Sequence, residues 1–193
     1  AVIETRPHCG RLVVNQKYAD CSNYVVANQA SRILRYTRAP PEYRLVPAES
    51  PGAYAFIHDE AERHVRNSPL LRRLPPNAVD ELTRLLLSGL ITQLTSMPVD
   101  CRIDRWICNE VGELRDEQER ALGRMLDANA QVLKTKDWTP RLIYNASNAM
   151  SAAFAKNAAD LFPDFEKYAR VYERPDFGEM GKKLAEYLDA DDH

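Results

Sequence analysis

The fold is decided by the apolar stretch of residues 77–97, which reads NAVDELTRLLLSGLITQLTSM. Its apolar side chains recur at helical spacing, at Val79, Leu82, Leu86, Leu90 and Met97. Further apolar residues widen this surface nearly all round the helix, at Leu85, Ile91 and Leu94. We therefore expect this helix to be central. A glycine within a helix costs about 1 kcal/mol relative to alanine, so we expect close packing against a neighbouring helix at Gly89.

Capping residues and prolines delimit the other helices. Ser50-Pro51 is typical of a helix start, Thr139-Pro140 opens another helix, and Pro98 is expected to break the chain after the central helix. The remaining predicted helices cover about 22–36, 51–66, 100–109, 114–133, 140–162 and 177–188. The fold class is thus mostly α, with six to seven helices around a central hydrophobic helix.

Two of these helices carry distinctive faces. In the helix of residues 22–36, a buried apolar stripe is predicted at Val26, Ala30, Ile33 and Leu34. In the helix that begins near Pro140, small residues suited to close helix contact recur on a face that comprises Leu142, Ala146, Ala149, Met150, Ala153 and Phe154.

The first twenty residues differ from the rest, because Val2-Ile3 and Leu12-Val13-Val14 are β-prone and flank a turn-like Pro7-His8-Cys9-Gly10. They predict a small N-terminal β element. We expect one domain over 1–193, with a β-like segment at 1–20 and a helical body at 22–188.

Composition narrows the function classes. The 193 residues carry a net charge of -2, which argues against a dedicated nucleic-acid binder. No secretory signal opens the chain, and the apolar run 85–94 is too short to cross a bilayer, so we expect no membrane partner and a cytoplasmic location. The cysteines lack the density of a disulfide framework and are expected to be free thiols: Cys9, Cys21, Cys101 and Cys108.

The first candidate site is the segment 26–35, VANQASRILR. Asn28 and Arg32 lie four residues apart, so they share one face of the predicted helix, with Gln29 beside the first of them. The segment resembles the His-Glu-x-x-His helix of zincin metallopeptidases with its ligands replaced: Asn28 and Arg32 stand at the histidine positions and Gln29 at the glutamate. Amides and a guanidinium cannot hold zinc or serve as general base. The resemblance therefore implies a non-catalytic relative with no cofactor.

The second hypothesis is that the chain is an enzyme, a metal-dependent hydrolase of zincin or HD type. The dipeptide His58-Asp59 resembles the His-Asp pair of HD-domain phosphohydrolases, and the helical spacing of Glu60 and His64 is suited to chelation. Zinc or another divalent metal would be held by some of His58, Asp59, Glu60, His64 and Asp104. The alternative is a solvated helix face with intrahelical ion pairs.

The third candidate is a binding surface. Arginine and tyrosine gather around the first helix and its exit, in a combination typical of protein interfaces and of phosphate or base contacts. The predicted binding residues are Arg32, Arg35, Tyr36, Arg38, Tyr43 and Arg44. A second arginine group comprises Arg63, Arg66, Arg72 and Arg73. Protein binding is the leading hypothesis, and a nucleic-acid-binding module is the alternative.

Overall fold

The computed structural model describes residues 2–6, 9–40, 42 and 49–190. Within them it has seven α-helices, in agreement with the predicted helical fold: α1 (Ser22–Arg38), α2 (Pro51–Asn67), α3 (Pro76–Glu110), α4 (Arg115–Val132), α5 (Arg141–Leu161), α6 (Glu166–Val171) and α7 (Gly178–Ala190). Short 3-10 turns connect several of them: η1 (Gln16–Cys21), η3 (Gly112–Leu114), η4 (Leu133–Thr135) and η5 (Pro163–Phe165).

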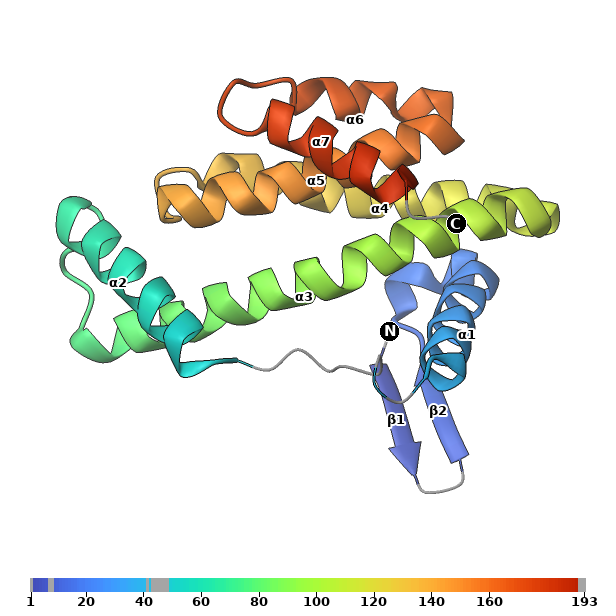
Figure 1. The fold of residues 1–193 in the computed structure, drawn as a ribbon, viewed down its shortest axis with the longest axis horizontal. Helices are drawn as coiled ribbons and strands as arrows, with labels where there is room; N and C mark the ends of the chain where they lie inside the picture. Colours follow the sequence, from blue (N-terminus) through green and yellow to red (C-terminus); the bar gives the residue numbers. More distant parts are fainter. Residues whose placement is uncertain (1, 7–8, 41, 43–48, 191–193) are drawn as a thin grey trace.

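The strands β1 (Val2–Arg6) and β2 (Cys9–Val13) pair antiparallel, with Val2 opposite Val13. Figure 1 shows this pair projecting from the helical body next to α1.

The helix starts follow local chemistry. The Ser50 side chain accepts a hydrogen bond from the Ala53 amide, and Pro51 occupies the first turn of α2, which confirms the predicted start. Pro140 precedes α5 as expected. The short helix α6 was not predicted, because its six residues are too few to show a periodic apolar pattern.

Helix α5 is the centre of the core, where the sequence had predicted the stretch 77–97. It packs against α3, α4, α6 and α7, and most of its residues from Ala149 to Ala159 are buried. In α3, by contrast, Leu85 is 71 % exposed and Leu94 is 62 % exposed. An apolar surface all round a helix therefore did not mark the central helix here.

Alanines allow the backbones of neighbouring helices to approach α5 closely. The predicted small-residue face is confirmed in part, because Ala149, Ala153 and Phe154 are buried but Leu142 is 48 % exposed.

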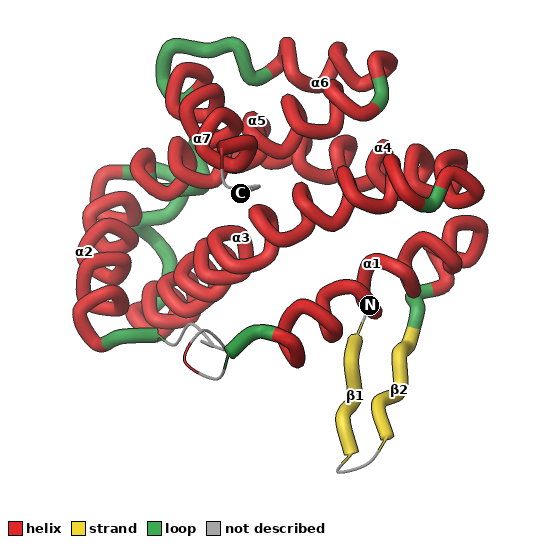
Figure 2. The backbone as a smooth tube through the Cα atoms, turned by 45° about the vertical axis from the view of Figure 1, so that its right-hand side comes forward, coloured by secondary structure: helices red, strands yellow, loops and turns green. Residues whose placement is uncertain are grey.

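Helix α3 continues through Pro98, where a break was predicted. A proline inside a helix costs about 3 kcal/mol or more. Beyond it, Ile103 and Ile107 are fully buried, and burying each such side chain contributes about 1.5–3 kcal/mol. Packing on both sides of Pro98 therefore offsets the lost hydrogen bond. Figure 2 shows α3 as one long helix that passes under α5 and reaches α1.

Among the described residues, none of the helices combines the length and the apolar composition that a membrane span requires.

Candidate functional site

The inner face of α1 carries polar residues at helical spacing. Tyr24, Asn28 and Arg32 follow one another at intervals of four, and all three side chains reach α3. Their partners there, Asp100 and Asp104, are also four residues apart. The shared face predicted for Asn28 and Arg32 is thus confirmed, because both contact the same neighbouring helix.

Asp104 is the most deeply buried member of this polar contact. Its Oδ1 accepts a hydrogen bond of 2.6 Å from the Tyr24 hydroxyl and one of 3.3 Å from the Asn28 amide. Its Oδ2 is also buried but has no hydrogen-bond partner among the described residues. Gln118 of α4 donates to the Asp104 carbonyl at 2.7 Å. One carboxylate oxygen is therefore left without compensation in a site that water reaches poorly.

Asp100 is compensated by Arg32. The Arg32 Nε donates to Asp100 Oδ1 at 2.8 Å, and its Nη2 forms an ion pair with the same oxygen. Arg32 is therefore held by α3, although it was predicted to contact a partner. Of the two carboxylates on this face, Asp104 is the one that pairs with no cation in the part of the chain that the structure describes.

Burial governs ionisation at this site. Desolvation raises the pKa of Asp104 to about 7, against the opposing hydrogen bond from Tyr24, and the nearby Asp100 raises it further. Desolvation also raises the pKa of Asp100, but Arg32 opposes that shift. The pKa of Tyr24 lies well above its usual value because of burial and the adjacent Asp104, so its hydroxyl stays neutral and donates.

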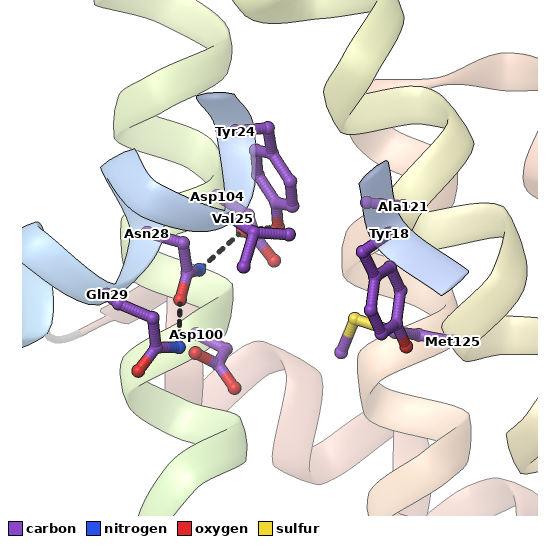
Figure 3. Close-up of a pocket in the computed structure, with 9 residues that line it drawn as sticks. All are labelled: Tyr18, Tyr24, Val25, Asn28, Gln29, Asp100, Asp104, Ala121 and Met125. Atoms are coloured by element: carbon purple, nitrogen blue, oxygen red, sulfur yellow. Dashed lines mark hydrogen bonds between the residues drawn. The ribbon is translucent and has the colours of Figure 1, made fainter. Parts of the chain in front are cut away.

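A cavity of about 200 Å³ lies beside these groups. Figure 3 shows α1 and α3 forming one wall, with Asn28, Gln29 and Asp100, and Tyr18 of η1 and Met125 of α4 forming the opposite wall. The side chains of Asn28 and Gln29 are bonded to each other at 3.2 Å. One side of the cavity therefore carries acidic and amide groups, and the other is aromatic and apolar.

The residues predicted to hold a metal ion in an HD-type hydrolase do not lie at one site. His58 Nε2 lies 3.3 Å from Asp80 Oδ1 on α3. Asp80 and Asp104 belong to the same continuous helix, so they are separated by about 36 Å at 1.5 Å per residue. Asp59 is exposed, and Glu60 pairs with Arg63. The structure brings Asp104 to the degenerate motif of α1 instead.

His64 lies in a different cavity from that of Asp104. It lines a volume of about 760 Å³ together with residues of α5 and of the loops beside it, among them Lys136, Arg141 and Asp176. In the described part of the chain, no three His, Cys, Asp or Glu side chains gather in a group that could hold a metal ion.

The outer face of α1 is apolar. Val26 is 45 % exposed, Ile33 is 44 % exposed and Leu34 is 50 % exposed, and Ala30 between them is exposed as well. The sequence pattern was correct, but the predicted burial of this stripe is wrong. Because Tyr24, Asn28 and Arg32 bind α3, the helix is turned with its apolar stripe outward.

Basic and aromatic residues flank that stripe. Arg35, Tyr36 and Arg38 are exposed in the last turns of α1. The predicted binding residues Tyr43 and Arg44 lie outside the described residues. We call the surface of Val26, Ala30, Ile33, Leu34, Tyr36 and Arg38 the outer α1 face. Arg35 follows Arg32 by three residues and therefore lies on the side of the inner face, at the exposed end of the helix.

The other predicted groups are largely structural. Arg63 and Arg66 pair with Glu60 and Glu62 along α2, as the intrahelical alternative predicted. Cys21, Cys101 and Cys108 form no disulfide bond in the described part of the chain. The side chain of Cys9 lies outside the described part of the chain.

Sequence reasoning missed Tyr18, Tyr24 and Met125 as lining residues of the cavity. A signal was present for Tyr24, which precedes Asn28 by four residues, as Asp100 precedes Asp104. No local pattern links Tyr18 or Met125 to the site, because they belong to η1 and α4 and approach it only in the folded chain.

Comparison with protein-family models, with curated proteins and with solved structures gave no match. The function is therefore inferred from the residues of this chain alone.

Proposed function

We propose that this chain is a non-catalytic domain that binds another protein through the outer α1 face. The observation that carries the proposal is the exposure of an apolar stripe at helical spacing, with Val26, Ile33 and Leu34 all turned away from the core. A contiguous apolar patch bordered by polar residues is typical of a protein interaction site. A helix that turns its polar face inward keeps this patch available.

The charge of α1 indicates the kind of partner. Residues 22–38 contain three arginines and no acidic residue, and Arg32 is already paired with Asp100. Arg35 and Arg38 are exposed in the last turn and make this end of α1 positive, next to the apolar stripe. An amphipathic helix with apolar residues at i, i+3 or i+4 and i+7, and with Asp or Glu beside them, fits both the stripe and this charge. A second copy of the chain would bring like charges together.

The inner face of α1 supports the non-catalytic part of the proposal. The positions that hold histidines in a zincin helix are occupied by Asn28 and Arg32, and both are bonded to carboxylates of α3. We propose that α1 resembles a zincin helix only as a structural and binding element, without metal ligands. Among the described residues, no comparable arrangement of side chains favours the hydrolase hypothesis or the nucleic-acid-binding hypothesis.

The test is selection from a displayed library of helical peptides against the purified chain. We expect enriched peptides to share apolar residues at i, i+3 or i+4 and i+7 with flanking acidic residues. Hot-spot residues at the centre of an interface cost about 2 kcal/mol or more when changed, and about 1.4 kcal/mol is tenfold, so Ile33→Asp or Val26→Asp should weaken binding by about tenfold or more. The matched control is Leu85→Asp, which alters an exposed leucine of α3 and should leave binding unchanged.

Two results would contradict the proposal. One is enrichment of peptides that bind all three variants equally. The other is a concentration-dependent dimer in sedimentation that Ile33→Asp dissociates, since a second copy would then be the occupant of the outer α1 face.

A further inference from the structure

We propose that the cavity between α1, α3, η1 and α4 binds a small organic monocation, an ammonium group on a short alkyl or aryl-alkyl chain. This inference concerns the inner side of α1 and does not depend on what the outer α1 face binds.

The two carboxylates at the cavity, of which one is paired with Arg32, favour a ligand with one positive charge. Asp100 and Asp104 line the cavity, and among the described residues that line it there is no cation. Arg32, outside this lining, is engaged by Asp100. Asp104 has less than a tenth of its surface exposed, yet its Oδ2 lacks a hydrogen-bond partner among the described residues. An ammonium group that donates to this oxygen would satisfy it and neutralise the carboxylate. Gln29 and Asn28 add amide oxygens at the same end of the cavity.

The opposite wall fits the organic part of such a ligand. Tyr18, Ala121 and Met125 line it (Figure 3). Val25 of α1 and the ring of Tyr24 add apolar surface on the other wall. Aromatic faces attract cations, and the thioether of methionine adapts to the shape of an apolar group. The cavity of about 200 Å³ has the volume of roughly seven water molecules at 30 Å³ each. This limits the ligand to a small amine.

A divalent metal fits less well. The Arg32 guanidinium is bonded to one of the two carboxylates and would repel a second cation of high charge. The Asn28 Oδ1 already accepts a hydrogen bond from Gln29. Hard cations take six or more oxygen ligands, and this site offers fewer that are unengaged.

The probe is phenethylamine, titrated into the full chain by calorimetry at about pH 6, where its ammonium group stays protonated as a lysine side chain does. The groups that face Asp104 are Tyr24 and Arg32 on α1 and Asp100 on α3. Tyr24 stays neutral at this pH because burial raises its pKa well above the usual value, and Arg32 holds Asp100. An ammonium that pairs with Asp104 should therefore displace up to about one proton, seen as a heat that depends on the ionisation enthalpy of the buffer.

The variants separate recognition from folding. Asp104→Asn keeps the shape and the acceptor for Tyr24 and should weaken binding by about tenfold or more, because the charged partner is lost. Asp80→Asn alters a carboxylate at the other end of α3 and should bind like the unaltered chain. The alcohol 2-phenylethanol, which lacks the charge, should not compete.

The inference is overturned if the alcohol binds as well as the amine, if Asp104→Asn retains full affinity, or if the amine does not bind at millimolar concentration. Zinc or magnesium binding that Asp104→Asn abolishes would also overturn it, since the site would then hold a metal.

Discussion

Helix α7 packs on α5 through small apolar residues, whereas α1 packs on α3 through hydrogen-bonded polar ones. At the first contact, Gly181 lies against Ala149 and Ala152, close enough that an added Cβ would lie 2.5 Å from the Ala152 Cβ. At the second, the buried groups are Tyr24, Asn28 and Asp104. The first contact joins residues about thirty positions apart, and the second joins residues 76 to 80 positions apart.

The two helix contacts differ in the kind of interaction that stabilises them. The α5–α7 contact depends on shape and does not change with pH. The α1–α3 contact depends on the ionisation state of Asp104 and on whatever pairs with its free oxygen. We therefore expect the α1–α3 contact to respond to pH and ligands. The following changes test that contrast, from the largest expected effect to the smallest.

Asp104→Asn should have the largest effect, and its direction depends on pH. The pKa of Asp104 is about 7 in the folded chain, raised chiefly by burial, against 3.8 in the unfolded chain. The folded state thus binds the proton more tightly, so this group's stabilising contribution is complete below about pH 4 and is lost as the pH rises through about 7. At about pH 8, Asp104→Asn should be more stable than the unaltered chain by roughly 2–4 kcal/mol, measured by urea unfolding.

The same two proteins should differ little in their free energy of unfolding at about pH 3, which is below the pKa of the carboxyl in both states. The control is Asp80→Asn, since the Asp80 side chain is about half exposed and should change stability by less than about 0.5 kcal/mol at either pH. If the stability of Asp104→Asn falls between these pH values as steeply as that of the unaltered chain, then burial of this carboxylate does not control the α1–α3 contact.

Gly181→Ala tests the apolar contact. The added methyl group would lie 2.5 Å from the Ala152 Cβ and 3.0 Å from the Ala149 carbonyl oxygen. Overpacking of this kind costs about 1–3 kcal/mol, and we expect a loss of that size in the free energy of unfolding at every pH. Adding Ala152→Gly removes one of the two close contacts and should recover part of the loss. A loss that changes strongly with pH would remove the contrast with the α1–α3 contact.

The contrast also explains which features could be predicted from the sequence. The start of α2 at Ser50-Pro51, the shared face of Asn28 and Arg32 and the buried alanines of α5 depend on neighbours along one segment, and all three were predictable. The inner face of α1 depends on Asp100 and Asp104, which are 68 to 80 positions away from their partners on α1. Periodicity gave the stripe of Val26 and Ile33 but could not show which side of the helix meets the core.

The same reason accounts for the other corrections. Pro98 has a clear local preference to end a helix, but the burial of Ile103 and Ile107 beyond it decides the outcome. Leucines at 85 and 94 indicate burial, but α5 approaches its neighbours more closely because its residues are small. The cavity combines residues from four elements, so the pattern of no single segment of the sequence predicts it.

Gly89→Ala is the matched counterpart of Gly181→Ala and should have the smallest effect, with the opposite sign. The sequence predicted close packing at Gly89, but an added Cβ there would have no heavy atom within 4 Å, so that prediction is wrong. The glycine lies within α3, and replacing it removes only the excess backbone freedom of the unfolded chain.

We therefore expect Gly89→Ala to raise the free energy of unfolding by about 0.5–1 kcal/mol, the difference in helix propensity between the two residues. Urea unfolding of both alanine variants in parallel measures the contrast directly, because the substitution and its effect on the unfolded chain are the same. The sign should be set by the neighbours alone: Ala152 and Ala149 at Gly181, and solvent at Gly89. A loss of stability at Gly89 similar to that at Gly181 would mean that another surface covers this part of α3, for example a bound partner or a second copy of the chain. Sedimentation at the concentration of the unfolding measurement would then show the larger assembly.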